Sequence, residues 1–416
     1  MAGFQTFIRS LVALTGLFFV GAVRLALAWP PEIGPELIFT NDEIELAWKA
    51  QSDLTDTKNP VSLRVQQSFR DEVRLRCPEC PIRELTDRYG VLKYRVFPAV
   101  PSIPGWYFEI TLDVGVIEIT SKPIPVDRML GVSEALEELV YHVAQSLKLR
   151  PARAGHLNLG IVSTFGGDAY LFRNFIVDYF NHPSLTRGVT GYYDKANAPH
   201  PEELEAFERL RLRKILDTAS PSAYDPAREG IEVLARRLYD EVYVSTPVFW
   251  DEIGFSPQKY QALNVSSIVE QDKKALNSWP RIELRATAMQ KSVRELQLIS
   301  NLFAARIEFL KRRYGPYYGK PLGLVPYIGH ENYHSLSPDA AIADFYRYIT
   351  EAGLAWNDYK GLVNQKPSYR RALEKFERGG IPEPELPAGL ASTPAFRSGS
   401  TCPDVFSRLG RLLGLL

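Results

Sequence analysis

Apolar and polar residues alternate with a period of two in five short stretches of the chain. Successive side chains of a β-strand point to opposite faces, so this alternation predicts strands that bury one face and leave the other polar. The predicted strands are VLKYRVF (91–97), WYFEITL (106–112), VIEIT (116–120), HLNLGIVSTF (156–165) and WPRIELRAT (279–287). A tight DVG turn joins the second and third of them into a hairpin.

Apolar residues recur at helical spacing in the longer stretches between and after these strands. Ser133 is expected to cap the first predicted helix, and Pro183 to stop the second. Residues 60–75 mix strand and helix signals, so the pattern leaves both open there. The predicted helices span 127–149, 168–183, 202–216, 225–243, 288–314, 339–352 and 368–378.

Strands and helices do not alternate regularly, which predicts an α+β fold with an antiparallel or mixed sheet. We expect the sheet to be curved, with one polar face, and to be flanked by helices. From Gly379 onward the composition shifts to Pro, Gly and Ser, which is typical of a poorly packed extension. The chain therefore divides into a leader (1–28), one large domain (29–378) and a tail (379–416) with a short amphipathic end.

The leader has the order of a secretory signal peptide. Arg9 supplies a positive charge, residues 11–23 are apolar, and Ala26 to Ala28 form a small-x-small cleavage pattern. We expect cleavage after Ala28 and an exported protein, periplasmic or secreted. An uncleaved anchor is the alternative, although the run is shorter than the roughly 20 residues of a membrane span. No transmembrane span is expected in the mature chain, and without a true leader the protein would be cytoplasmic.

Composition and charge narrow the classes of function only slightly. Lys plus Arg and Asp plus Glu both number 49, and no long basic block is present, so nothing favours nucleic-acid binding. Of the three cysteines, Cys77 and Cys80 form CPEC, and Cys402 lies in the tail. A zinc site would need two further ligands, so a local disulfide or an ordinary exposed loop are the alternatives for CPEC.

The polar faces of the predicted strands carry an unusual set of side chains. A sheet with one face in water alternates by default, but its water-facing side chains are more typically Lys, Thr, Ser and Gln. Here they are groups that bind hard metals, carboxylates or phosphates. Grouped carboxylates repel one another, and a divalent cation and arginines would relieve that repulsion. The set comprises Glu109, Asp113, Glu118, His156, Asn158, Arg281, Glu283 and Arg285.

Four segments resemble, in order, motifs of the glutamine synthetase and glutamate–cysteine ligase superfamily of carboxylate–amine ligases, which includes the amidoligases. IGPELIF (33–39) is similar to the early strand with a metal-binding Glu, and DVGVIEITSKP (113–123) to the segment with a second one. GHLNLG (155–160) is similar to the strand whose His binds a metal. ALNVSSI (262–268) with RIELRA (281–286) resembles the late Asn-containing segment and the E-x-R strand.

This resemblance implies a glutamine synthetase-like catalytic domain and a role for each matching residue. Arg285 would bind phosphate or a substrate carboxylate and, with Glu283, carry catalysis. Asp113 is a further metal candidate on the hairpin. The implied substrate-binding residues are Asn158, Gly160 and Arg281. The implied metal ligands are Glu36, Glu109, Glu118, His156 and Glu283.

The function implied by the resemblance is an ATP-dependent ligase that uses Mg²⁺ or Mn²⁺. It would activate a small-molecule or peptide carboxylate as an acyl phosphate, which an amine then attacks. Relatives often share sites across subunits, so a homo-oligomer is also implied. ATP is scarce outside the cytoplasm, so export favours a second hypothesis: an inactive or repurposed metal-binding or peptide-binding protein of the same fold. A metal-dependent hydrolase is a third.

Two further motifs are candidate sites. GHENYHSL places His330 and His334 four residues apart, but the neighbouring Gly and Pro residues favour a loop over a helical metal face. STFGGD (163–168) has two glycines before a helix, which could hold a phosphate on backbone N–H groups.

Overall fold

The structure is a computed structural model, and ten segments of the chain are described by it. They are residues 30–51, 59–86, 90–152, 155–185, 206–244, 261–270, 280–315, 323–328, 337–363 and 365–379. The predicted leader, and the predicted tail from residue 380 onward, lie outside these segments. Within them, every helix is too short or too polar to cross a membrane.

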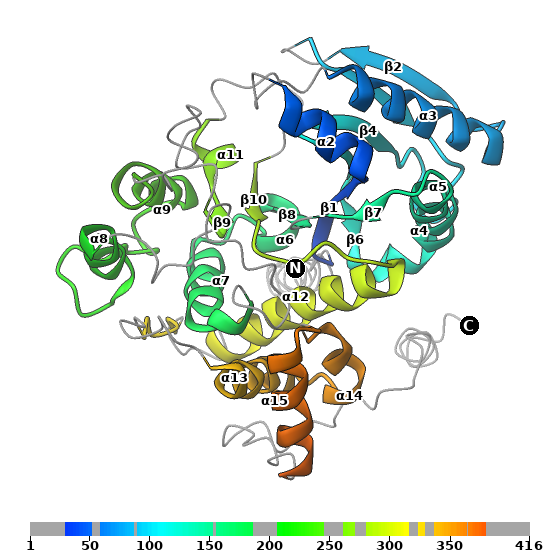
Figure 1. Cartoon of the computed structure of the whole chain (residues 1–416). Helices are drawn as coiled ribbons and strands as arrows, with labels where there is room; N and C mark the ends of the chain where they lie inside the picture. The colour runs from blue at the N-terminus through cyan, green and yellow to red at the C-terminus, as the bar shows by residue number, and fades with distance from the viewer. Residues whose placement is uncertain are drawn as a thin grey trace, which may run out of the picture.

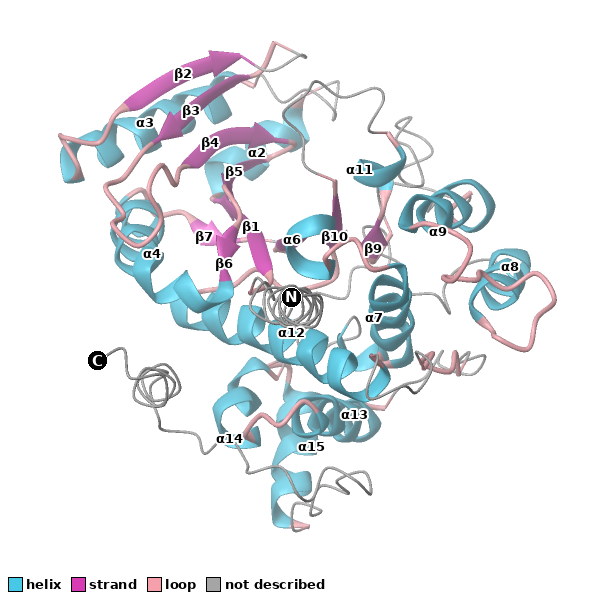
Figure 2. Cartoon of the chain, turned by 180° about the vertical axis from the view of Figure 1, so that it is seen from behind, coloured by secondary structure: helices cyan, strands magenta, loops and turns pink. Residues whose placement is uncertain are grey.

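The described strands form one open sheet (Figure 2) in which every ladder is antiparallel. The order across the sheet is β2-β3-β4-β5-β1-β8-β10-β9, and the short β6 and β7 also pair with β1. The strands are β1 (Glu32–Thr40), β2 (Ile82–Thr86), β3 (Leu92–Val96), β4 (Phe108–Asp113), β5 (Val116–Ser121), β6 (Ile124–Pro125), β7 (Arg150–Pro151), β8 (His156–Gly160), β9 (Leu263–Asn264) and β10 (Arg281–Leu284).

Helices flank this sheet, so the molecule has the α+β architecture expected from the sequence. Those in the first half of the chain are α2 (Asp42–Ala50), α3 (Pro60–Arg76), η1 (Val126–Arg128), α4 (Met129–Leu136), η2 (Glu137–Tyr141), α5 (His142–Ser146), α6 (Ile161–Phe165), α7 (Ala169–Asn181) and η3 (Pro183–Leu185). Those in the second half are α8 (Ala206–Leu216), α9 (Ile231–Arg237), η5 (Leu238–Val242), α11 (Ser266–Val269), α12 (Val293–Tyr314), α13 (Pro338–Glu351), α14 (Trp356–Tyr359), η9 (Lys360–Leu362) and α15 (Pro367–Arg378).

The core lies between the apolar face of the sheet and the helices that cover it. Phe108, Ile110 and Ile119 on β4 and β5 are no more than 1% exposed, and α3 packs against these two strands. The long helix α12 contacts α4, α7 and α13 and lies between the sheet and the α13–α15 group (Figure 1). One face of the sheet therefore packs against helices, and the other carries polar side chains.

The segment after β8 corrects one prediction from the sequence. HLNLGIVSTF was expected to be a strand throughout, but the strand ends at Gly160 and α6 follows. Ile161, Thr164 and Phe165 are buried, which is the i, i+3, i+4 spacing of one helical face. β-Branched residues favour strands only weakly, so packing of the buried face against the core determines that this segment is a helix.

The helix predicted over 127–149 also differs in detail. It consists of η1, α4, a π-helical turn η2 and α5, and it ends at Ser146. Ser133 lies inside α4 and donates its hydroxyl to the carbonyl of Met129, so its expected role as N-cap was wrong. Residues 60–75, which the sequence left open, form most of α3, capped by Asn59.

Candidate metal centre

Three adjacent strands bring polar side chains together on one face of the sheet. The register pairs Glu36 of β1 with His156 of β8, and Asn158 of β8 with Glu283 of β10. Paired residues of antiparallel strands point to the same side, so these four side chains share a face. Leu157 between them is fully buried on the opposite face. The period-two pattern in AGHLNLG therefore reflects a strand with one apolar and one functional face.

The centre of this face is the Glu–His–Glu cluster, formed by Glu36, His156 and Glu283. Nδ1 of His156 lies 2.9 Å from Oε2 of Glu36 and 3.1 Å from Oε1 of Glu283. One ligand atom from each residue lies within 4.8 Å of the other two. Their side chains are only 9–14% exposed, so their electrostatic interactions are screened less than those of surface groups.

Asparagines hold the outer oxygens of both carboxylates. Asn158 donates through Nδ2 to Oε1 of Glu36 at 2.8 Å and to the carbonyl of Gly34 at 3.1 Å. Asn264 donates through Nδ2 to Oε2 of Glu283 at 2.8 Å. The cluster is therefore held from both sides by neutral donors.

Two arginines border the cluster and make different contacts. Arg285 is 8% exposed and donates from an Nη atom to Oε1 of Glu283 at 2.5 Å. Arg281 donates through Nε to Oδ1 of Asn158 at 2.7 Å. Arg285 is thus a cation directly at the cluster, whereas Arg281 contacts it through Asn158.

The charges of the cluster shift the pKa values of two of its members. Burial and the Arg285 charge lower the pKa of His156, but hydrogen bonds to Glu283 and Glu36 and the Glu283 charge outweigh them and raise it to about 9. Burial opposes ionisation of Glu283, but Arg285, His156 and Arg281 hold the pKa of its carboxyl well below its usual range. An ion that binds Nδ1 of His156 would have to displace a proton.

The donor set of the cluster fits a hard divalent cation. Two carboxylate oxygens and one imidazole nitrogen are within reach of a shared ion, and carboxylate-rich sites suit Mg²⁺ and Mn²⁺. Asparagine hydrogen bonds to the ligands are the kind of outer contact that orients a metal site. Glu36, His156 and Glu283 are therefore the residues that could hold such an ion.

Other residues expected at the metal site lie elsewhere on the same sheet. Glu118 of β5 is paired with Ile38 of β1 and so faces the same side, but it is not part of the Glu–His–Glu cluster. Glu109 of β4 forms ion pairs with Arg95 at 2.6 Å and Lys93 at 3.7 Å. The structure therefore brings together three of the five expected ligands.

The remaining expected residues have local structural contacts. Asp113 accepts a hydrogen bond from the backbone N–H of Val114 at 2.8 Å, in the turn between β4 and β5. Gly160 is paired with Arg281 and immediately precedes α6, where a Cβ atom would collide with Oγ of Ser163. The hydroxyl of Ser163 can rotate away, so this contact alone does not require a glycine at position 160.

Asn264 is a site residue that sequence reasoning did not single out as a ligand or substrate contact. It lies in β9, a strand of two residues, which is too short to show any alternation. Its position within ALNVSSI, beside RIELRA in the motif comparison, was the signal that could have identified it.

A second buried polar cluster joins α7, α12 and α13. Arg306 donates to both oxygens of Asp178 at 2.7 and 2.6 Å. Asp344 lies 2.9 Å from Nδ1 of His182 and accepts from Oγ of Ser184 at 2.6 Å. The serine and the histidine both contact the aspartate, so the serine hydroxyl is not activated by the histidine, and this cluster serves to join helices.

The motif STFGGD does not present a phosphate site. The N–H groups of Gly166 and Asp168 donate to the carbonyls of Val162 and Phe165. The carboxylate of Asp168 accepts from the N–H groups of Tyr170 and Leu171, and so occupies the place at the N-terminus of α7 that an anion would take.

Two other sequence motifs have separate outcomes. His330 and His334 lie outside the described residues. Cys77 and Cys80 form a disulfide at the end of α3, with their Cα atoms 5.3 Å apart. The local disulfide was one of the alternatives left open by the sequence.

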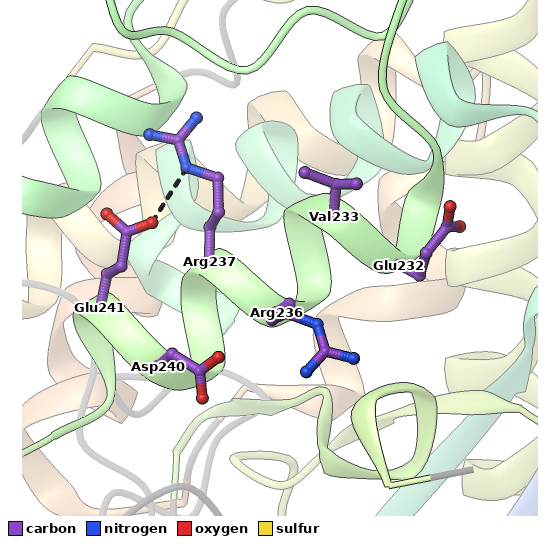
Figure 3. A pocket seen from close by; sticks show the side chains of 6 residues that line it. All are labelled: Glu232, Val233, Arg236, Arg237, Asp240 and Glu241. Carbon is purple, nitrogen blue, oxygen red and sulfur yellow. Dashed lines mark hydrogen bonds and ion pairs between the residues drawn. The ribbon is translucent and has the colours of Figure 1, made fainter. Parts of the chain in front are cut away.

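A pocket on α9 and η5 is separate from the Glu–His–Glu cluster (Figure 3). Its lining carries two arginines and three carboxylates, and Arg237 pairs with Glu241 at 3.2 Å. None of its lining residues is a predicted site residue. They are Glu232, Val233, Arg236, Arg237, Asp240 and Glu241.

Known structures resemble this chain only distantly. No family model matches the sequence. No curated protein matches it. A solved structure described as apo GmaS without ligand is similar over 85% of this chain and 68% of that chain, with 11% sequence identity and a TM-score of 0.36. A likeness at this level establishes neither a family nor an activity.

Proposed function

We propose that this chain is an ATP-dependent and Mg²⁺-dependent (or Mn²⁺-dependent) carboxylate–amine ligase of the glutamine synthetase and glutamate–cysteine ligase superfamily. The observation that supports this most directly is the Glu–His–Glu cluster with Arg285 beside it, on the polar face of an antiparallel sheet. We assign this activity to residues 29–378. The identity of the cluster residues agrees with the motifs that carry the resemblance.

The proposed reaction has two steps. An oxygen of the substrate carboxylate attacks the γ-phosphorus of ATP, the bond to the β-phosphate oxygen breaks, and ADP leaves. The amine nitrogen then attacks the carbonyl carbon of the acyl phosphate, inorganic phosphate leaves, and the nitrogen loses a proton. Both steps develop negative charge on oxygen atoms that must be stabilised.

The residues of the cluster and its neighbours would have different roles in these two steps. Glu36, His156 and Glu283 would hold a Mg²⁺ ion, which when bound neutralises phosphate charge and orients the γ-phosphoryl group. Arg285 would release Glu283 to the ion and turn its planar fork toward the transferred phosphoryl oxygens. Asn158, Arg281 and Gly160 lie at the neighbouring end of β8 and β10, where we place the substrate.

The proposal is tested by assaying the full chain with Mg²⁺, ATP and mixed pools of carboxylic acids and amines. ADP release that needs both an acid and an amine, with a product lighter by one water than its two substrates, is the expected result. Glu283→Gln should abolish it, whereas Glu308→Gln, on an exposed part of α12, should not. ADP release that is independent of both substrates, or equal in both variants, would overturn the proposal.

The alternative function is an exported protein of the same fold that binds a metal ion or a peptide-like anion without turnover. The signal-like leader favours it, because ATP is scarce outside the cytoplasm. It predicts divalent-cation binding that depends on Glu283 and no binding of ATP with Mg²⁺ present, which calorimetry distinguishes from the ligase.

A further inference from the structure

Each carboxylate of the Glu–His–Glu cluster is held by one asparagine, and Glu283 also accepts a hydrogen bond from Arg285 at its inner oxygen. Each has one oxygen bound by an asparagine amide at 2.8 Å, from Asn158 to Oε1 of Glu36 and from Asn264 to Oε2 of Glu283. The other oxygen of each carboxylate faces Nδ1 of His156. Each glutamate therefore has a single oxygen directed to the centre of the cluster.

The orientation of both amides is fixed by groups that can only donate. Nε of Arg281 lies 2.7 Å from Oδ1 of Asn158. The backbone N–H of Ser266 lies 2.9 Å from Oδ1 of Asn264. Because the amide oxygen must face these donors, the NH₂ group of each asparagine must face the carboxylate. Both asparagines are also buried, with 8% and 6% exposure, so water competes little for these bonds.

We propose that Asn158 and Asn264 hold Glu36 and Glu283 as monodentate ligands, so that the site selects Mg²⁺ or Mn²⁺ over Ca²⁺. In this role Arg281 is a positioning residue, because it sets the orientation of Asn158. The inference rests on the proposed function, since it assumes that the cluster binds a metal ion.

The physical reason lies in the coordination that each ion prefers. Ca²⁺ takes six to eight oxygen ligands and often binds carboxylates through both oxygens, whereas Mg²⁺ requires a compact octahedral arrangement. Turning either glutamate to a bidentate arrangement would break its bond to the asparagine and leave a buried NH₂ group without that acceptor. This cost would fall on Ca²⁺ and not on Mg²⁺.

Displacement of bound Mn²⁺, followed by electron paramagnetic resonance, tests the inference without any measurement of turnover. The full chain is loaded with Mn²⁺ and titrated with Mg²⁺ or Ca²⁺, and the ratio of the two displacement constants is compared among variants. The variants are Asn158→Leu, Asn264→Leu and Arg281→Leu. Asn357→Leu is the matched control, because Asn357 is an exposed asparagine of α14.

The wild type and Asn357→Leu should release Mn²⁺ at lower Mg²⁺ than Ca²⁺. Asn158→Leu and Asn264→Leu should each move the ratio toward Ca²⁺ by about 10-fold, because loss of a residue that orients metal ligands typically lowers metal affinity by about 10- to 100-fold and this loss should fall mainly on Mg²⁺. Arg281→Leu should shift it in the same direction by less. If the buried asparagine variants do not fold, the half-buried Arg281 variant decides the question.

Two results would overturn the inference, and they are distinguishable from failure of the proposed function. A ratio that stays unchanged in every folded variant, or a wild type that prefers Ca²⁺, removes the role of the asparagines while leaving the metal site intact. A wild type that binds no Mn²⁺ removes the metal site, and the proposed ligase with it.

Discussion

Glu283 lies between two cations, because His156 and Arg285 both contact its Oε1 atom. Replacing it with Gln would leave those two cations facing each other without the charge that binds them. Removing one partner of a buried ion pair typically costs about 3 kcal/mol or more. We expect Glu283→Gln to lower the free energy of unfolding of the metal-free protein by about 3 kcal/mol.

Urea denaturation at pH 7 measures this change. Glu308→Gln is the control, since Glu308 is 44% exposed and its pair with Lys311 is a surface contact. Equal stability of the two variants would show that the charges at the Glu–His–Glu cluster do not contribute to folding.

Arg285 should be needed for turnover but not for metal binding. In the metal-free protein it shares Oε1 of Glu283 with His156, so it competes with an incoming ion. Arg285→Gln should therefore retain Mn²⁺ affinity or increase it, while kcat of the proposed ligase falls by about 10²–10³-fold through loss of charge stabilisation. Loss of Mn²⁺ binding together with unchanged kcat would contradict this role.

At the residue scale, the sequence could predict which face a side chain takes but not its position across the sheet. Alternation placed Glu109 on the polar face with His156 and Glu283, and the register agrees. Several strands separate it from them, however, and the neighbouring Arg95 of β3 binds it instead. Strand order is a property of the folded chain that period-two patterns do not contain.

At the scale of elements, long amphipathic helices and alternating strands were predictable because each has its own period. The residues at which short elements begin and end were not predictable. α6 follows β8 directly, and three of its five residues, Ile161, Val162 and Thr164, have β-branched side chains, which favour strands. What decided the helix was burial of one face against the core, which local sequence does not reveal.

The junction between α7 and α13 gives a prediction about pH. Burial would raise the pKa of Asp344, but the charge of His182 and hydrogen bonds from His182, Ser184 and Arg347 hold it well below its usual range. A carboxyl with a lowered folded pKa stabilises the fold above its unfolded pKa of about 3.9, and that stability is lost as the pH falls below it. Asp344→Asn should therefore flatten the loss of stability below about pH 4.

The same substitution should cost about 2 kcal/mol at pH 7, because it removes a buried carboxylate that accepts hydrogen bonds from His182, Ser184 and Arg347. Urea denaturation between pH 2 and pH 7 measures both effects, with the exposed Asp358→Asn as control. A parallel pH dependence of wild type and Asp344→Asn would show that this carboxyl is not part of the acid sensitivity.

At the scale of the whole molecule, the compartment in which the protein resides determines whether ATP is available to it. The leader predicts that the mature chain begins at Trp29. Mass spectrometry of the protein from a host that exports it should find this N-terminus in the exported fraction. An intact Met1 terminus on protein retained in the cytoplasm would contradict the leader and would remove the main support for the non-ligase alternative.

The central claim is that the polar face binds a nucleotide together with a metal ion held by the Glu–His–Glu cluster. Isothermal titration of ATP into the full chain, with and without Mg²⁺, tests it most directly. We predict binding that requires Mg²⁺, persists in Glu308→Gln and is lost in Glu283→Gln. Absence of ATP binding in the wild type with Mg²⁺ present, or equal binding in Glu283→Gln, would contradict the account.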